Sequence, residues 1–212
     1  MLPTTVRVSG GEFLYREDNM DNHIRLFNLI APFYNLFFKM QTKNYRTLIE
    51  KNIDKIDISE DAQILDLGSG TGAFGYCWQE KGYEVKGVEA SPNMYKRCLS
   101  NGVDCEKIDI TEGLPFADNS FELVTAAYLI HGLTEEKRRI LYKETKRVAS
   151  EYVIYHDYHQ NDYLLIKIIE FLEGGDYFDF VKNVPEEFGE YFEDFKIVKN
   201  SPWNSWYIFK IH

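Results

Sequence analysis

The segment at residues 63–72 reads Gln63-Ile64-Leu65-Asp66-Leu67-Gly68-Ser69-Gly70-Thr71-Gly72. Its first half is a short apolar run, as in a strand buried within a parallel sheet. Three glycines then alternate with small polar residues, which allows a sharp turn and lets a ligand lie against bare backbone. The acid before the turn, Asp66, can accept hydrogen bonds from a cationic or hydroxylated group. The segment therefore predicts a loop that binds a nucleotide-type cofactor.

The glycine spacing alone does not identify the cofactor, because dinucleotide-binding proteins use a similar one. In the dinucleotide pattern the third glycine follows the second by three residues, whereas Gly72 follows Gly70 by two. The carboxylate of Asp66 would also repel a pyrophosphate, but it suits a ligand with an ammonium group and no phosphate. Residues 66–72 resemble the first motif of the class I S-adenosylmethionine-dependent methyltransferases. The resemblance implies S-adenosyl-L-methionine as cofactor and S-adenosyl-L-homocysteine as product.

Two further acids follow in the order expected for this family. Residues 84–88 read as a second strand, and Glu89 lies 21 residues beyond Gly68 (89 − 68), a separation that places a carboxylate under ribose hydroxyls. In the family an acid after the third strand binds the adenine amino group beside an apolar residue, and Asp109 and Ile110 match these positions. Taken alone, Glu89 could be a solvated acid and Asp109 a helix cap. Their occurrence in order favours the cofactor site.

The N-terminal region extends the resemblance. Residues 27–35 are similar to a segment of ubiquinone/menaquinone-type methyltransferases that closes over the cofactor, with a tyrosine near the methionine end. Tyr34 matches that tyrosine, whereas Asn35 replaces the usual aspartate. A helix that only packs at the sheet edge is the alternative for the other residues of this segment. The resemblance implies a cofactor site made of Tyr34, Asp66, Gly68, Ser69, Gly70, Thr71, Gly72, Glu89, Ala90, Asp109 and Ile110.

Candidate catalytic residues follow the fourth and fifth expected strands. Residues 128–133 resemble the family's loop after the fourth strand, with Gly132 where a second histidine is common. Ligands of open parallel sheets bind outside the carboxyl ends of the strands, so His131 and Asp157 are expected on one rim. A hydroxyl or acidic-carbon acceptor would need a general base within hydrogen-bond reach. His131 is the first candidate for that base and Asp157 the second.

The residues around Asp157 also suggest a metal site, with His156, Asp157, His159 and Asp162 as ligands. Neighbouring residues of a strand point to opposite faces, so His156 and Asp157 cannot both reach one ion without a bend. We therefore predict no metal, and a polar lining of the acceptor pocket instead.

The composition limits the partners. A net charge of −10 and a pI near 5.0 disfavour nucleic acid. Three cysteines without metal spacing indicate reduced thiols in the cytoplasm, and neither a signal peptide nor a membrane-length apolar run is present in the sequence. The predicted partner is a small-molecule methyl acceptor, with the oligomeric state left open. Six basic residues at helical spacing predict a solvated helix face: Lys137, Arg138, Arg139, Lys143, Lys146 and Arg147.

The sequence predicts an α/β fold: a Rossmann-like, seven-stranded, mostly parallel sheet with helices on both faces, an antiparallel last strand and an N-terminal helical lid. A single methyltransferase domain would span residues 1–212, with the lid segment at 1–58, the cofactor-binding core at 59–159 and closing elements at 160–212. The resemblance implies methyl transfer to a small, partly apolar acceptor. Two alternatives remain, a non-catalytic S-adenosylmethionine-binding protein and a nicotinamide-dependent oxidoreductase, and Asp66 disfavours the latter.

Overall fold

The computed structural model describes residues 36–159 and 177–211, and for residues 177–182 and 185 only the backbone. The chain divides into two units, Met1–Met40 and Gln41–His212, and the fold and site below belong to the second. Tyr34, Asp162 and most of the expected lid segment lie outside the described residues. Residues 36–52 are helical, and the part from residue 41 onward belongs to the second unit.

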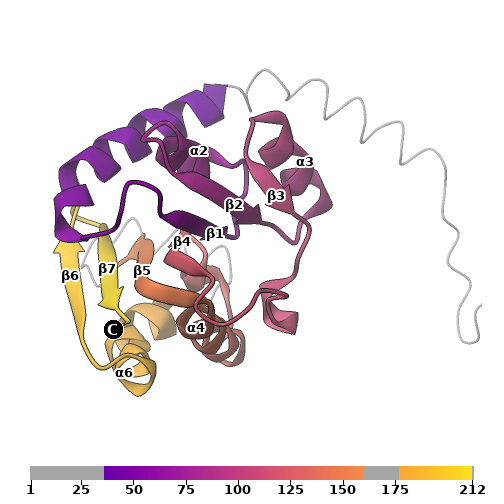
Figure 1. Ribbon diagram of the computed structural model, residues 1–212. Coiled ribbons are helices and arrows are strands. Elements are labelled where there is room, and N and C mark those ends of the chain that lie inside the picture. The colour runs from indigo at the N-terminus through magenta and orange to yellow at the C-terminus, as the bar shows by residue number, and fades with distance from the viewer. Residues whose placement is uncertain (1–35, 160–176, 212) are drawn as a thin grey trace, which may run out of the picture. The chain divides into compact units, whose positions relative to one another are not determined.

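Within the described residues the protein forms a seven-stranded sheet of order β3-β2-β1-β4-β5-β7-β6 (Figure 1). Neighbouring strands of the sheet pair in parallel, except that β7 is antiparallel to both β5 and β6. The predicted fold, with its antiparallel last strand, is therefore confirmed. The strands are β1 (Gln63–Leu67), β2 (Glu84–Val88), β3 (Asp104–Glu106), β4 (Phe121–Ala127), β5 (Ala149–Tyr158), β6 (Phe195–Lys199) and β7 (Asn204–Lys210).

Helices cover both faces of the sheet: α2 and α3 lie on one side, and α4 and α6 on the other (Figure 1). The bounds of these α-helices are α2 (Ala73–Gln79), α3 (Pro92–Ser100), α4 (Glu135–Val148) and α6 (Tyr177–Tyr191). Three short 3-10 turns join them: η1 (Ile53–Lys55), η2 (Ile110–Glu112) and η3 (Ile130–Gly132). The helix α4 passes directly into β5 at Ala149.

Alternation along β5 divides the aromatic core between the two faces. Tyr155 packs with its ring centroid 5.9 Å from that of Phe188 on α6. The next residue, His156, points the other way and lies 6.0 Å from Tyr45 and 6.4 Å from Phe74, between ring centroids. Burial lowers the pKa of His156 to about 4. The predicted alternation therefore holds here, and it turns Asp157 away from His156.

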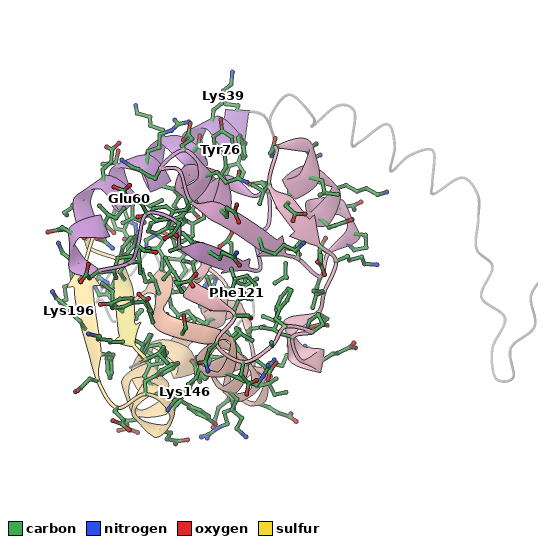
Figure 2. The ribbon with its side chains drawn as sticks, in the orientation of Figure 1. Lys39, Glu60, Tyr76, Phe121, Lys146 and Lys196 are labelled. Atoms are coloured by element: carbon green, nitrogen blue, oxygen red, sulfur yellow. The ribbon has the colours of Figure 1, made fainter. Side chains whose placement is uncertain are left out.

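The prediction that the basic face of α4 is solvated is wrong for one of the six basic residues. Arg138 is 1% exposed and lies between α4 and α6. Arg147 is also engaged, since its guanidinium donates to the Phe116 and Leu114 carbonyls at 2.7 and 2.9 Å. In Figure 2, Lys146 lies toward the outside of the fold, whereas Phe121 points into it. Helical spacing indicated a face, but not that α6 would cover part of it.

Candidate active site

The glycine loop between β1 and α2 makes the sharp turn that the sequence predicts. Gly68, Gly70 and Gly72 have φ values of +60°, +56° and +81°, a region that L side chains rarely adopt. Space is also tight at two of them, because a Cβ on Gly68 would lie 2.7 Å from Leu129 Cδ1 and one on Gly72 would lie 3.0 Å from Cys98 Sγ. A Cβ on Gly70 would meet only the Gly68 carbonyl, at 3.9 Å. A ligand can therefore approach the backbone at Gly70.

Glu89 lies beside this loop. Leu67 pairs with Val88 in the parallel register, so the residues that follow β1 and β2 leave the sheet side by side. The Glu89 carboxylate accepts hydrogen bonds from the Gly70 N–H at 2.9 Å and from the Ser91 N–H at 2.8 Å. The carboxylate that the sequence predicts for ribose is thus adjacent to the predicted cofactor loop.

The polar side chains of the loop point into the protein. The Ser69 hydroxyl donates to the Asp66 carbonyl at 2.7 Å, and the Thr71 hydroxyl donates to Gln41 Oε1 at 2.9 Å. Ser69 is 9% exposed and Thr71 is 7% exposed. The loop therefore presents backbone, rather than these hydroxyls, to a ligand.

The carboxylate of Asp66 is buried beneath the loop. It is 1% exposed, and its Oδ1 accepts a hydrogen bond from Thr125 Oγ1 on β4 at 3.0 Å. Burial raises the pKa of Asp66 to about 7, although the bond from Thr125 opposes the shift. The geometry makes Asp66 a support for the loop, and its direct contact with the cofactor stays a prediction. Thr125 was not predicted from the sequence, although a polar residue within an apolar strand was an available signal.

Asp66→Asn should therefore change how stability depends on pH. Between about pH 4 and pH 7 the folded protein holds a proton that the unfolded chain releases, so the wild-type free energy of unfolding falls as pH rises. A pKa of about 7 against 3.8 corresponds to at most about 4 kcal/mol. Asparagine is neutral throughout and removes this contribution, so relative to wild type the variant gains stability toward pH 8. Urea unfolding of both proteins across this range measures the difference.

His156 contributes a slope of the opposite sign, because its pKa is lowered to about 4 and the unfolded chain takes up a proton first as pH falls. This slope is present in both proteins and cancels when one curve is subtracted from the other. If the amide changes the free energy of unfolding by an amount that does not depend on pH, the curve of the variant is displaced but its slope is unchanged. Parallel curves for wild type and variant would show that Asp66 is ionised in the folded protein at all these pH values.

Asp109 and Ile110 follow β3 and come next along the same edge of the sheet. Asp109 is exposed and caps η2, where its Oδ1 accepts from the Thr111 hydroxyl at 2.7 Å and the Thr111 N–H at 2.9 Å. These bonds lower the pKa of Asp109. Ile110 is buried in the core, Ala90 is exposed, and Asp109 borders an open pocket of about 480 Å³. The helix cap left open as an alternative is formed, and a role toward adenine stays a prediction.

His131 and Asp157 are hydrogen-bonded to each other. His131 Nδ1 lies 2.8 Å from Asp157 Oδ1, with 23% of the histidine side chain exposed and 1% of the aspartate side chain. Backbone N–H groups hold the carboxylate in place: Oδ2 accepts from Ile130 at 3.0 Å and from His131 at 3.4 Å, and Oδ1 accepts from Tyr158 at 2.8 Å. The two candidates, ranked as alternatives from the sequence, thus form one unit in which a buried carboxylate orients a partly exposed imidazole.

Two tyrosines flank this histidine. The ring centroid of His131 lies 4.8 Å from that of Tyr158 and 6.3 Å from that of Tyr128. Tyr128 has a φ of +53°, a conformation that costs a non-glycine residue about 1–3 kcal/mol and persists only where its surroundings fix it. Its hydroxyl accepts a hydrogen bond from Asn204 Nδ2 at 2.8 Å. Such strain is typical of functional sites, and the sequence held no signal for it.

The candidate residues follow one order along the edge formed by the carboxyl ends of the parallel strands. Because the sheet runs β3-β2-β1-β4-β5, Asp109 comes first, then Glu89, the glycine loop, and the His131–Asp157 pair. Open α/β sheets bind their ligands at this edge.

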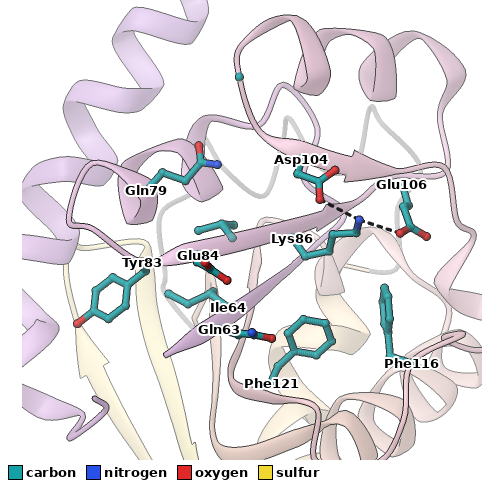
Figure 3. Close-up of a pocket in the computed structure, with 12 residues that line it drawn as sticks. Gln63, Ile64, Gln79, Tyr83, Glu84, Lys86, Asp104, Glu106, Phe116 and Phe121 are labelled. Atoms are coloured by element: carbon teal, nitrogen blue, oxygen red, sulfur yellow. Dashed lines mark hydrogen bonds and ion pairs between the residues drawn. The ribbon is translucent and has the colours of Figure 1, made fainter. Parts of the chain in front are cut away.

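A second pocket, of about 790 Å³, lies at the opposite edge of the sheet (Figure 3). It is lined by the first residues of four parallel strands, Gln63, Glu84, Asp104 and Phe121. Lys86 crosses it and binds the carboxylates of Asp104 and Glu106 at 2.9 and 2.8 Å. Although larger, this pocket is remote from the glycine loop and is not the cofactor site.

Residues 36–159 and 177–211 contain no group of three or more His, Cys, Asp and Glu side chains arranged to hold a metal ion. Over the same residues, no helix combines the length and the apolar character needed to cross a bilayer.

Comparison with known proteins agrees with the fold. Residues 64–151 match the family model described as a methyltransferase domain. A crystal structure of a SAM-dependent methyltransferase from Archaeoglobus fulgidus aligns with a TM-score of 0.64 at 17% identity, over 84% of this chain and 99% of that one, which shows a shared fold. Residues 64–151 therefore resemble a methyltransferase domain, and the described residues share the fold of a SAM-dependent methyltransferase.

Two relatives found by sequence comparison are named for quinones. Demethylmenaquinone methyltransferase from Paenarthrobacter aurescens is 28% identical over 130 residues, which cover 58% of this chain and 50% of that protein. A ubiquinone/menaquinone biosynthesis C-methyltransferase from Desulfotalea psychrophila is 32% identical over 122 residues, which cover 52% and 48%. The chain spans about half the length of these relatives.

Proposed function

We propose that this protein transfers a methyl group from S-adenosylmethionine to a small, partly apolar acceptor. The observation that carries the proposal is the position of the His131–Asp157 pair, which follows the glycine loop in the row of candidate residues. A histidine held by a buried carboxylate is typical of a general base, and here it lies where the acceptor would meet the donor.

Each residue of the pair has a separate task. Asp157 accepts the Nδ1–H bond and keeps the imidazole in one orientation, so that proton exchange takes place at Nε2. Nε2 removes the proton of an acceptor hydroxyl or acidic carbon as the methyl group moves. S-adenosylmethionine supplies an electrophilic methyl group on a sulfonium, which needs no further activation. Alignment of donor and acceptor, and exclusion of water at the carboxyl edge of the sheet, then account for much of the remaining acceleration of methyl transfer.

The surroundings of the pair favour a planar acceptor with an apolar part. Tyr128 and Tyr158 present aromatic surface next to His131, and their ring centroids lie 5.2 Å apart. Aromatic rings pack well against other flat rings and offer a hydroxyl at one end. Because two relatives are named for quinones, a panel of acceptors should begin with a reduced naphthoquinone and continue with simple phenols, carbon acids and amines.

The net charge of −10 favours a small molecule over nucleic acid as partner. Cys77, Cys98 and Cys105 are free thiols. Reduced thiols are typical of a cytoplasmic protein, which is the location that we propose.

The non-catalytic alternative keeps the same cofactor site and differs only in turnover. It is favoured if S-adenosylhomocysteine binds but no acceptor of the panel is methylated by the wild-type protein. The oxidoreductase alternative requires NADH to bind at the glycine loop, beside the carboxylate of Glu89. The two alternatives are therefore separated from the proposal by ligand binding and by turnover, measured independently.

Thermal unfolding with each ligand tests the cofactor part of the proposal. S-adenosylhomocysteine at about 100 times its dissociation constant should stabilise the protein by ~2.7 kcal/mol and raise the midpoint by roughly 5–10 °C. Glu89→Ala should abolish most of this shift, because it removes the carboxylate for ribose. Glu136→Ala, an exposed acid on α4, is the control and should keep it. A shift with NADH alone, or none with either adenosyl ligand, would refute the assignment.

A further inference from the structure

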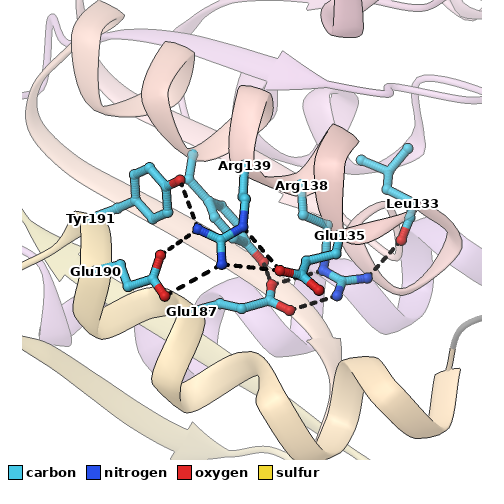
Figure 4. A network of polar contacts seen from close by, with 8 residues as sticks. Leu133, Glu135, Arg138, Arg139, Glu187, Glu190 and Tyr191 are labelled. Atoms are coloured by element: carbon cyan, nitrogen blue, oxygen red, sulfur yellow. Dashed lines mark hydrogen bonds and ion pairs between the residues drawn. The ribbon is translucent and has the colours of Figure 1, made fainter.

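Arg138 joins α4, α6 and the turn that carries His131 (Figure 4). Its Nε and one terminal nitrogen donate to the two carboxylate oxygens of Glu187 at 2.8 and 2.6 Å. The other terminal nitrogen donates to the Leu133 carbonyl at 2.7 Å. The side chains of Arg138 and Glu187 are 1% and 5% exposed. The guanidinium therefore reaches the C-terminal end of η3 while its charge is balanced from α6.

The turn η3 is held at both of its ends by buried charged groups. At its start, Asp157 accepts the Ile130 and His131 N–H groups. At its end, Leu133 caps η3 through the bond from its N–H to the Ile130 carbonyl at 3.2 Å, and its own carbonyl is taken by Arg138. Gly132 lies between the two ends, and a Cβ there would meet nothing within 4 Å. Without Arg138, the polar contacts described here would hold η3 only at its start.

Stability alone does not explain this arginine. Replacing a buried ion pair with apolar side chains of similar volume is often neutral or stabilising, because desolvation offsets the attraction. A planar guanidinium instead gives a fixed direction to three hydrogen bonds at once. Here two of them fix Arg138 on Glu187, and the third fixes a carbonyl two residues from His131.

We propose that Arg138 is a positioning residue, which together with Glu187 fixes η3 so that His131 Nδ1 faces Asp157. The consequence for catalysis rests on the proposed function, but the positioning itself does not. Arg138 is not a catalytic residue in this proposal, because it contacts the His131 turn and neither substrate nor cofactor.

The test is the tautomer of His131, read from the side-chain ¹⁵N chemical shifts of the full chain. The variant Arg138→Met/Glu187→Met/Tyr142→Phe removes the ion pair, and it also removes the Tyr142 hydroxyl that donates to Glu187 at 3.1 Å. It should fold and bind S-adenosylhomocysteine as wild type does, since the glycine loop is untouched. The ratio of the Nδ1–H to the Nε2–H tautomer of His131 should fall about 10-fold, the effect of weakening one hydrogen bond to a charged group.

A matched control lies on the same two helices, one residue beyond Arg138 on α4 and three residues beyond Glu187 on α6. Arg139 and Glu190 also form an ion pair between α4 and α6, but they are partly exposed and make no hydrogen bond to Leu133 (Figure 4). Arg139→Met/Glu190→Met should leave the His131 tautomer ratio at the wild-type value. If the control variant changes the His131 tautomer ratio equally, the ¹⁵N resonances report only how α6 packs against α4. That result would overturn the proposal.

Arg138→Lys provides a second variant if the apolar replacement does not fold. Lysine keeps the charge opposite Glu187, but it cannot reproduce the guanidinium fork and bond Leu133 in the same direction. It should also shift the His131 tautomer ratio, and a wild-type ratio in this variant would overturn the proposal. If the ratio shifts while the wild-type protein methylates no acceptor of the panel, the positioning inference stands and the proposed function fails.

Discussion

Replacing His131 with glutamine should lower the rate of methyl transfer about 10²–10⁴-fold, which is the usual contribution of a positioned general base. Glutamine retains hydrogen-bonding capacity near Asp157, but it has no nitrogen that can take up a proton at neutral pH. The dissociation constant for S-adenosylhomocysteine should stay unchanged, because the glycine loop and Glu89 bind the other part of the row. Single-turnover formation of S-adenosylhomocysteine, with an acceptor from the panel, measures the rate.

Asp157→Asn should produce a loss of similar size for a different reason. The amide oxygen can still accept backbone N–H bonds, whereas the amide N–H₂ would donate to His131 Nδ1 and leave the proton on Nε2. The imidazole would then be held in the tautomer that cannot act as a base. If both variants methylate the acceptor at the wild-type rate, no general base is used and alignment of donor and acceptor carries the reaction.

Arg138→Met alone should destabilise the protein by about 3–5 kcal/mol, because it leaves the Glu187 carboxylate buried without its partner. Glu187→Met should cost about the same, since the guanidinium is then the unpaired group. Combining the two changes should recover much of the loss, and adding Tyr142→Phe removes the remaining orphaned hydroxyl. Urea unfolding at pH 7 gives each free energy, and the set forms a mutant cycle for the pair.

Arg139→Met is the comparison for this prediction. The Arg139 side chain is 37% exposed, so the loss of this arginine leaves Glu190 in contact with water and should cost far less than Arg138→Met. Equal losses for Arg138→Met and Arg139→Met would mean that the buried position of Arg138 has no energetic consequence. It would also mean that the ion pair between Arg138 and Glu187 is accessible to solvent in the folded protein.

Short-range patterns predicted the sheet well. The apolar run before the glycines and the second strand at 84–88 agree with β1 and β2, and the structure confirms the antiparallel last strand. The reason is physical: strands buried on both faces show up as apolar runs, and glycines mark turns that other residues rarely make. Glu89 beside the loop was also predicted, because its position depends only on two adjacent strands.

Features of the site that depend on packing between distant segments were not predicted from the sequence. The sequence offered His131 and Asp157 as separate candidates, and their pairing requires the register of β4 against β5. Arg138 was expected on a solvated face because the sequence does not show where α6 would lie. Asp66 was expected to face a ligand, and only the structure shows its carboxylate turned under the loop toward Thr125.

The reversed direction of β7 has a consequence for how this protein can diversify. Since β7 alone runs antiparallel, its first residue, Asn204, lies at the same rim as the ends of β4 and β5, where it bonds the Tyr128 hydroxyl. In the function that we propose, the ends of β1, β2 and β3 would contact the methyl donor, and the rim formed by β4, β5 and β7 would contact the acceptor. Changes in the β6–β7 connection can therefore remodel the acceptor side of the rim during evolution while the donor side is left intact. New acceptors can thus be acquired on an inherited donor site.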